Sequence, residues 1–314
     1  MRKSIFRALF AGAIMTLAPL TAMQLSAAPA PAAPGAPALG PTGQGQEVDV
    51  ALVLAVDVSG SIDYQEAELQ RKGIVDAFLS KEVIQAIQSG SLGRIGVSVV
   101  YFSSADYGVM SVPVNWMVVQ DQNSATAFVK ALVAARRPSA RGTSISDALE
   151  LSLRMLEKGP YHAVKRVIDV SGDGANNAGG PVLEARNEVL SKGITINALP
   201  IIDDSTPQDL DKYFEGCVVG GPGNFVIPAK GFGDFARAMR RKLVLEISGL
   251  TPKELPEGNP LLIKVAAANP PQQGARPRPN LPPARPFNTN PPYPGGCDFP
   301  MFGGGFGNFG FGFR

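Results

Sequence analysis

The stretch VDVALVLAVDVSGSID, residues 48 to 63, passes from a nearly continuous apolar run into a group of oxygen-bearing side chains. Apolar runs of this kind are typical of parallel strands that helices cover on both faces. The run ends at Asp57, and Ser59, Ser61 and Asp63 follow at alternate positions. The sequence therefore predicts a buried strand whose carboxyl end carries a polar loop.

Strand and helix patterns then alternate along the chain. Apolar runs predict further strands at RIGVSVVYFSS, VPVNWMVV (at a sheet edge), RVIDVSG, ITINALPI and NFVIPA. Helical spacing predicts a helix from about Tyr64 with Asp63 near its start, and a second helix that Asn123 or Ser124 caps. Further helices are predicted after RGTS, in PVLEARNEVLSKG with Pro181 in the first turn, and in GFGDFARAMRRKLVLEI. This alternation predicts an α/β fold with a doubly wound, mostly parallel sheet flanked by helices.

Three of the predicted loops carry similar chemistry. The first holds Asp57, Ser59 and Ser61, the second holds Thr143 at a helix start, and the third holds Asp173 directly after a strand. Because ligands of open α/β sheets bind beyond the carboxyl ends of the strands, we expect these side chains to converge. Two carboxylates and three hydroxyls suit a hard divalent cation, with Mg²⁺ favoured and Mn²⁺ or Ca²⁺ as alternatives.

Helix capping and turn formation also favour Asp and Ser, but they explain one of these loops and leave the other two unexplained. Asn176 and Asn177, which follow Asp173 in VSGDGANN, either shape the site or form a turn. The sequence leaves both roles open for these two residues.

In order and placement, Asp57, Ser59, Ser61, Thr143 and Asp173 resemble the metal-ion-dependent adhesion site (MIDAS) of the von Willebrand factor type A (VWA) domain. That site uses Asp-x-Ser-x-Ser, a Thr and an Asp. The stretches VIDVSGDG and CVVGGPGNF are also similar to an uncharacterised bacterial exported subgroup of the family.

The resemblance implies an adhesion-type binding module without catalytic residues. It implies that Ser59 and Ser61 hold the metal directly and that the other three residues bind it directly or through water. One coordination position would remain for an Asp or Glu supplied by a protein partner.

Composition divides the chain into four predicted parts. They are a signal peptide over 1–28, a Pro/Ala/Gly linker over 29–46, a VWA-like domain over 47–248, and a disordered Pro/Gly/Phe-rich tail over 249–314. Arg2, Lys3 and Arg7 precede the apolar stretch of the first part, which is short for a transmembrane span and contains Pro19. We therefore expect export to the periplasm or the medium, with membrane contact only through an uncleaved signal segment.

The net charge of +2 is unevenly distributed. Arg2, Lys3 and Arg7 supply three positive charges, and the tail carries six basic and three acidic residues, which leaves the middle with four net negative charges. A mildly acidic domain without a basic stripe gives no reason to expect nucleic acid as a partner.

Histidine and cysteine are scarce. His162 is the only histidine and precedes a predicted strand, so we expect a structural or surface role at the amino end of the sheet. Cys217 and Cys297 are the only cysteines, too few for a cysteine-based zinc site. Cys217 is expected in a loop as a small buried side chain, and a disulfide to Cys297 is an open alternative for an exported protein.

Two other functions remain as alternatives to a metal-dependent binding module. An Mg²⁺-dependent phosphohydrolase would also use an Asp directly after the first strand. Such enzymes carry the pattern Asp-x-Asp there, whereas in this chain Ser59 occupies the place of the second Asp. An envelope structural or assembly protein would act through its tail. The sequence leaves the identity of the partner and the oligomeric state open.

Overall fold

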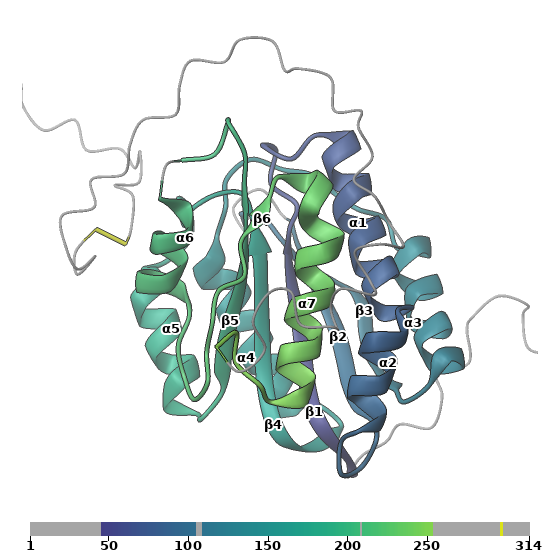
Figure 1. The fold of residues 1–314 in the computed structure, drawn as a ribbon. Coiled ribbons are helices and arrows are strands. Elements are labelled where there is room, and N and C mark those ends of the chain that lie inside the picture. Colours follow the sequence, from purple (N-terminus) through teal and green to yellow (C-terminus); the bar gives the residue numbers. More distant parts are fainter. Residues whose placement is uncertain (1–44, 105–108, 208, 254–295, 298–314) are drawn as a thin grey trace, which may run out of the picture. The chain divides into compact units, whose positions relative to one another are not determined.

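A six-stranded sheet organises the part of the chain that the computed structural model describes, residues 45–104, 109–207, 209–253 and 296–297 (Figure 1). Its strands are β1 (Gln46–Asp57), β2 (Ile95–Phe102), β3 (Met110–Val119), β4 (Tyr161–Gly172), β5 (Thr195–Ile202) and β6 (Ala229–Lys230), in the order β3-β2-β1-β4-β5-β6. All pairings in this sheet are parallel except that of β3 with β2 at one edge. The predicted fold class is confirmed, and VPVNWMVV lies in the edge strand.

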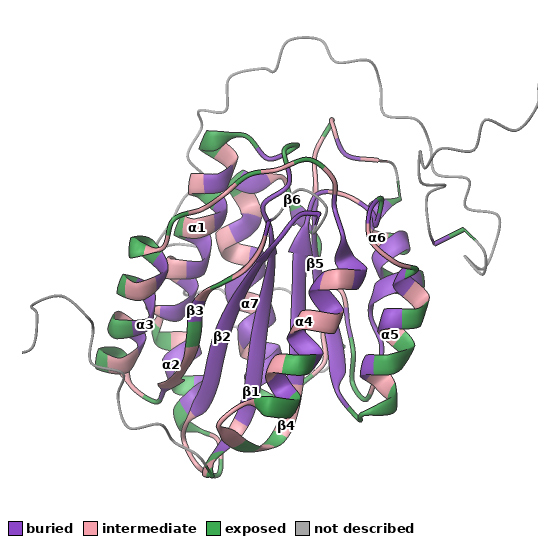
Figure 2. Cartoon of the chain, turned by 180° about the vertical axis from the view of Figure 1, so that it is seen from behind, coloured by how far each residue is buried: buried purple, intermediate pink, exposed green. Residues whose placement is uncertain are grey.

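Helices cover both faces of the sheet. They are α1 (Tyr64–Phe78), α2 (Lys81–Gln88), α3 (Gln122–Ala134), α4 (Ile145–Lys158), α5 (Val182–Ser191), α6 (Leu210–Tyr213), the π-helix η2 (Phe214–Val218), the 3₁₀ helix η3 (Phe232–Asp234) and α7 (Phe235–Ser248). Helices α1, α2, α3 and α7 contribute to the core on one face, and α4, α5, α6 and η2 to the core on the other. Figure 2 shows β1, β2 and β5 largely buried between these layers, whereas the edge strand β3 is only partly buried.

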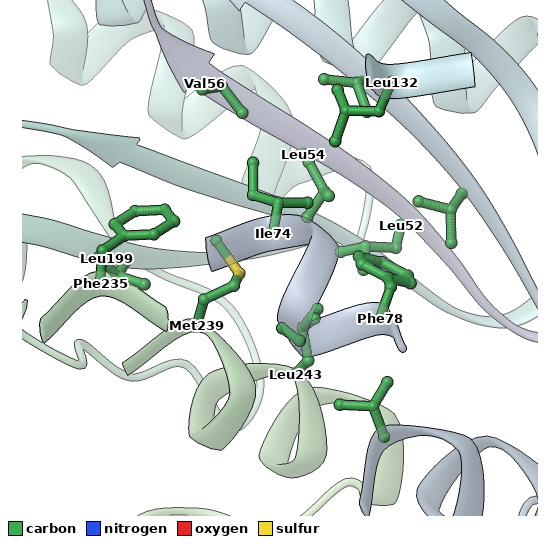
Figure 3. Packing of buried hydrophobic residues seen from close by; sticks show 14 of the residues in the cluster. Leu52, Leu54, Val56, Ile74, Phe78, Leu132, Leu199, Phe235, Met239 and Leu243 are labelled. Atoms are coloured by element: carbon green, nitrogen blue, oxygen red, sulfur yellow. The ribbon is translucent and has the colours of Figure 1, made fainter. Parts of the chain in front are cut away.

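The central strand β1 supplies side chains to both cores because successive residues of a strand point to opposite faces. Leu52, Leu54 and Val56 belong to the core under α1 and α7, whereas Val53 and Ala55 belong to the core under α4 and α5. Figure 3 shows the first group beside Ile74 and Phe78 of α1 and Phe235, Met239 and Leu243 of α7. Each such aliphatic or aromatic side chain contributes about 1.5–3 kcal/mol when fully buried. Burial on both faces explains why β1 reads as a continuous apolar run.

The observed helix starts agree only in part with those predicted from the sequence. Asp63 caps α1, since its Oδ1 accepts a hydrogen bond from the Glu66 nitrogen at 2.9 Å and its own nitrogen donates to Glu66 Oε2 at 2.8 Å. The prediction that Asn123 or Ser124 caps α3 is wrong. Asp121 is the cap, because its Oδ1 accepts from the Ser124 nitrogen at 2.8 Å while Ser124 Oγ accepts from the Asp121 nitrogen at 3.0 Å.

Pro181 was expected in the first turn of α5 and lies one position earlier, at the cap. The prediction of a full strand at NFVIPA is also wrong, since only Ala229 and Lys230 form β6. Pro228 has no backbone N–H, and the nitrogen of Phe225 donates to Oδ1 of Asn197 at 3.0 Å, so this segment cannot make a regular ladder. The short helices α2 and α6 were not predicted.

Cys217 lies in η2 rather than in a loop, and it forms a disulfide with Cys297. Of the two alternatives for these cysteines, the structure therefore supports pairing. His162 is the second residue of β4, at the amino end of the sheet as expected.

The predicted signal peptide lies outside the described residues, as do nearly all of the linker and the tail. Within the described ranges, none of the helices combines the length and apolar character needed to span a membrane.

Candidate metal centre

The predicted site lies where the order of the strands reverses. β1 ends at Asp57 and pairs in parallel with β4, which ends at Gly172, so the loops that follow both strands emerge at the same edge. On one side of β1 lie β2 and β3, and on the other side lie β4, β5 and β6. In doubly wound sheets this switch point is where ligands bind.

Hydrogen bonds join four of the five predicted residues. The Ser59 nitrogen donates to Asp57 Oδ1 at 2.7 Å, and Ser59 Oγ lies 3.0 Å from Ser61 Oγ. Ser61 Oγ donates to Asp173 Oδ1 at 2.9 Å, which connects the loop after β1 with the loop after β4. The structure thus brings together Asp57, Ser59, Ser61 and Asp173.

Thr143 joins this group through its loop. A Cβ atom added to Gly174 would lie 3.5 Å from Thr143 Oγ1, so the hydroxyl borders the segment that begins with Asp173. The backbone of Thr143 is fixed by Asn177, whose Oδ1 accepts from the Thr143 nitrogen at 2.8 Å and whose nitrogen donates to the Thr143 carbonyl at 2.9 Å. All five predicted residues therefore lie at the same edge of the sheet.

The two asparagines shape the site rather than forming only a turn. Asn177 holds the loop of Thr143, as described above. Oδ1 of Asn176 accepts from the nitrogen of Ser146 in the first turn of α4 at 3.1 Å, and its Nδ2 donates to the Gly180 carbonyl at 3.1 Å. The loop after β4 is thereby fastened to the start of α4, the helix that follows Thr143.

Burial controls the electrostatics of the two carboxylates. Asp57 has no solvent exposure, and its burial, together with the negative charge of Asp173, raises its pKa to about 8. Burial also raises the pKa of Asp173 to about 6, although the hydrogen bond from Ser61 opposes that rise. Two neighbouring buried carboxylates favour a bound cation, because the cation would offset the free-energy cost of burying their negative charges.

The donor set fits a hard divalent cation. Oδ2 of Asp57 is buried and accepts no hydrogen bond from the described residues, so it is free to bind a metal. A Cβ atom on Gly172 would lie 2.8 Å from that oxygen, which explains why glycine ends β4. Gly60 and Ser61 are exposed, and they leave the site open toward solvent.

Carboxylates are few at this site. No group of three or more His, Cys, Asp or Glu side chains in the described ranges is arranged to hold a metal ion. A metal at this edge would therefore depend on hydroxyl oxygens in addition to Asp57 and Asp173, as the sequence predicts.

Arg137 is a neighbour of the site that the sequence did not indicate. It follows α3, and its positive charge acts on both Asp57 and Asp173. A single arginine in a loop carries no recognisable motif, so only the folded structure reveals this proximity.

Fold and site together define an α/β protein with an oxygen-lined polar centre at the switch point of a doubly wound sheet. The chain belongs to the DUF1194 family, described as "Protein of unknown function (DUF1194)", which matches residues 47–251. No curated protein is similar enough to count as a match.

Several solved structures are similar to this chain. The pilus adhesin SpaC from Lactobacillus rhamnosus GG is 17% identical, with a TM-score of 0.49, over 66% of this chain and 32% of SpaC. Proximal thread matrix protein 1 from the mussel byssus, with a zinc-occupied MIDAS motif, is 16% identical, with a TM-score of 0.47, over 65% of this chain and 47% of that protein. An aerotolerance-related membrane protein from Bacteroides fragilis NCTC 9343 is 19% identical, with a TM-score of 0.37, over 62% of this chain and 98% of that one. This chain thus spans less than half the length of the first two proteins.

Proposed function

We propose that this protein is an exported, metal-dependent binding module of the VWA type that captures an acidic residue of a partner protein. In this proposal Asp57, Ser59, Ser61, Thr143 and Asp173 hold a divalent cation, with Mg²⁺ favoured. The observation that carries the proposal is the convergence of two buried carboxylates with serine hydroxyls, leaving Oδ2 of Asp57 without a hydrogen bond from the described residues.

Each protein group has a distinct part in this function. The Ser59 nitrogen fixes Oδ1 of Asp57, so that Oδ2 is the carboxylate oxygen left to face a cation. Ser61 orients Asp173 by donating to its Oδ1. A bound divalent cation would supply a partly neutralised positive charge and a coordination position for an anionic oxygen.

The site also has the access that a binding module needs. Ser61 and Gly60 are exposed, whereas Asp57, Ser59 and Thr143 are buried behind them. A carboxylate of a partner would therefore approach from the side of Ser61. Export is proposed on the basic, apolar and small-residue order of the first 28 residues.

The proposal is tested by affinity capture from envelope extract with Mg²⁺ or with EDTA. Thr143→Ala and Asp173→Ala are expected to lose the partner that the unaltered protein captures, and EDTA should have the same effect. Thr126→Ala in α3 and Asp76→Ala near the end of α1 alter the same residue types outside the five-residue site and should capture it normally. Circular dichroism checks that all variants are folded. Equal capture in Mg²⁺ and in EDTA would overturn the proposal.

A further inference from the structure

An open groove lies between the edge strand β3 and helix α4. Its cavity has a volume of about 370 Å³, which falls within the usual range of ligand-binding pockets. The two elements supply its lining: Val112, Asn115 and Trp116 from β3, and Arg154, Met155 and Lys158 from α4. Because β3 pairs with β2 alone in the sheet, its outer side stays open among the described residues.

The groove is separate from the candidate metal centre. Strand β3 begins with Met110, which pairs with Phe102, and Phe102 in turn pairs with Asp57. From there β3 runs away from the metal centre to Val119. The last turns of α4, which end at Lys158, precede the start of β4 at the amino end of the sheet. A molecule in the groove therefore meets a different surface from one at the metal.

Trp116 forms a fixed aromatic wall of the groove. Its ring meets that of Tyr161 edge-on, with the centroids 5.7 Å apart and the ring planes at 88°. A Cβ atom on Gly159 would lie 3.2 Å from Trp116 Nε1, so glycine lets the end of α4 approach the indole closely. The indole is half-buried, and Val112 in the same lining is 38% exposed. A rigid, partly exposed tryptophan is a typical anchor of a protein interface.

Positive charge marks the α4 side of the groove. Arg154 and Lys158 are exposed, and none of the described residues that line the cavity carries a carboxylate. Arg154 Nη1 lies 3.6 Å from Glu150 Oε2, and both side chains are about half exposed. Because exposed ion pairs of this kind add little to stability, Arg154 can exchange Glu150 for a carboxylate from outside. The groove is therefore complementary to an acidic molecule with an apolar part.

Charge also distinguishes between the occupants of such a groove. The tail over 249–314 has six basic and three acidic residues, so its net charge has the same sign as the cations of the groove. A second copy bound by two-fold symmetry would place Arg154 and Lys158 against the same cations of the other copy. A separate acidic partner avoids both repulsions.

We propose that the groove between β3 and α4 is a second, metal-independent docking surface, which binds an acidic segment of a partner protein. An aromatic or aliphatic side chain of the segment packs on Trp116 and Val112, while its carboxylates meet Arg154 and Lys158. The two cations are four residues apart on α4, which places their Cβ atoms about 5–6 Å apart. Alternate side chains of an extended segment are about 6.6 Å apart and share one face, so acidic residues at alternate positions match the cations.

Trp116 reports on its own environment, because it is the only tryptophan of the chain. The probe is a random copolymer of glutamate and tyrosine, titrated with excitation that selects tryptophan, in EDTA so that the metal centre takes no part. The variant Arg154→Glu/Lys158→Glu reverses both charges of the groove. Its matched control, Lys81→Glu/Lys130→Glu, reverses two exposed charges on α2 and α3 at the other face of the sheet.

We expect the copolymer to shift the emission of the unaltered protein to shorter wavelength, with saturation, because it displaces water from the indole. The charge-reversed variant should bind about tenfold more weakly, because carboxylates would then face carboxylates. The control variant should bind like the unaltered protein. Poly-L-glutamate should bind more weakly than the copolymer, since it offers no aromatic side chain to the cavity. Without the copolymer, the emission of both variants should match that of the unaltered protein, which shows that Trp116 keeps its packing.

Three results would overturn the proposal. The first is a titration without a saturable shift, or equal affinities of the charge-reversed and control variants. The second is a dimer of the unaltered protein in sedimentation velocity that the charge-reversed variant does not form, which would assign the groove to a second copy. The third is a shift with phosphatidylglycerol vesicles and none with the copolymer, which would assign it to a membrane surface. Since the assay contains EDTA, failure of the metal-dependent capture leaves all of these results unaffected.

Discussion

The backbone nitrogen of Asn176 donates a hydrogen bond to the hydroxyl of Tyr213 at 3.1 Å. The same hydroxyl donates to the carbonyl oxygen of Cys297 at 3.0 Å, and Cys297 is disulfide-bonded to Cys217. A buried tyrosine thus connects the loop that follows Asp173 to a residue far along the chain. Tyr213 therefore supports the loop that follows Asp173 in the candidate metal centre, and no motif in the sequence predicts this role.

Replacing Tyr213 with Phe should destabilise the protein by about 1–3 kcal/mol, because the buried nitrogen of Asn176 loses its acceptor and the carbonyl of Cys297 loses this donor. Urea unfolding followed by circular dichroism measures the change. Tyr64→Phe is the control, since Tyr64 is 80% exposed and should tolerate the loss of its hydroxyl. Equal midpoints for the two variants would contradict this reading of the hydrogen bonds.

Metal binding should appear as thermal stabilisation. Mg²⁺ or Mn²⁺ is expected to raise the melting temperature by mass action, and Asp57→Ala should abolish the response because Oδ2 is lost. Asp63→Ala is a matched control in the same loop. It removes the cap of α1, which costs about 1 kcal/mol, but should keep the response to metal. A metal-independent melting curve of the unaltered protein would reject the adhesion-site interpretation.

Position 172 should not tolerate even the methyl side chain of alanine. The added methyl of Gly172→Ala would lie 2.8 Å from Asp57 Oδ2 and 3.0 Å from Asp57 Cβ, so the carboxylate would have to move. We expect a loss of about 1–3 kcal/mol, typical of overpacking, together with a weaker thermal response to Mn²⁺. Gly180→Ala is the control, because no heavy atom lies within 4 Å of its added methyl. An unchanged Mn²⁺ response in Gly172→Ala would show that the position of Asp57 Oδ2 is unimportant.

The sequence predicts those features that are encoded locally or by a motif. The apolar run of β1 and the spacing of Asp57, Ser59 and Ser61 are visible in one short stretch, and the alternation of elements then predicts the edge where Asp173 lies. Features that depend on distant contacts were missed or misjudged. Arg137, whose charge acts on Asp57 and Asp173, belongs to a segment whose Ala140 pairs with Ser59 in the folded chain.

Local competition explains the misplaced elements. Asp121 outcompetes Asn123 and Ser124 as the cap of α3 because Asp121 and Ser124 satisfy each other's backbone nitrogens. The strand expected at NFVIPA is interrupted because Asn197, a buried polar side chain of β5, takes the hydrogen bond of Phe225. Neither the cap at Asp121 nor the interruption of the strand follows from residue propensities alone, because each depends on which hydrogen-bond partner lies nearby.

A buried charge cluster joins α7 to the sheet beneath it. Lys242 Nζ lies 2.6 Å from Asp169 Oδ1 of β4 and 2.5 Å from Glu246 Oε1, and all three side chains are almost completely buried. Nδ2 of Asn197 also donates to Glu246 Oε1 at 2.8 Å. A second ammonium group lies close by, since Lys165 Nζ donates to the Glu246 carbonyl oxygen at 3.3 Å and its charge acts on Glu246. Burial and the charge of Glu246 nevertheless both raise the pKa of Asp169, which favours its protonated form.

Asp169→Asn should therefore change how stability depends on pH. Burial, followed by the charge of Glu246, raises the pKa of Asp169 from 3.8 to about 7. Between these values the folded protein keeps a proton that the unfolded chain has released, so stability falls as pH rises through this window. We expect the variant to lose a pH-dependent change of about 2–4 kcal/mol between pH 4 and pH 7, measured by urea unfolding in EDTA. Asp209→Asn, at an exposed position, should keep the slope of the unaltered protein, and an identical slope in Asp169→Asn would show that another group holds the proton.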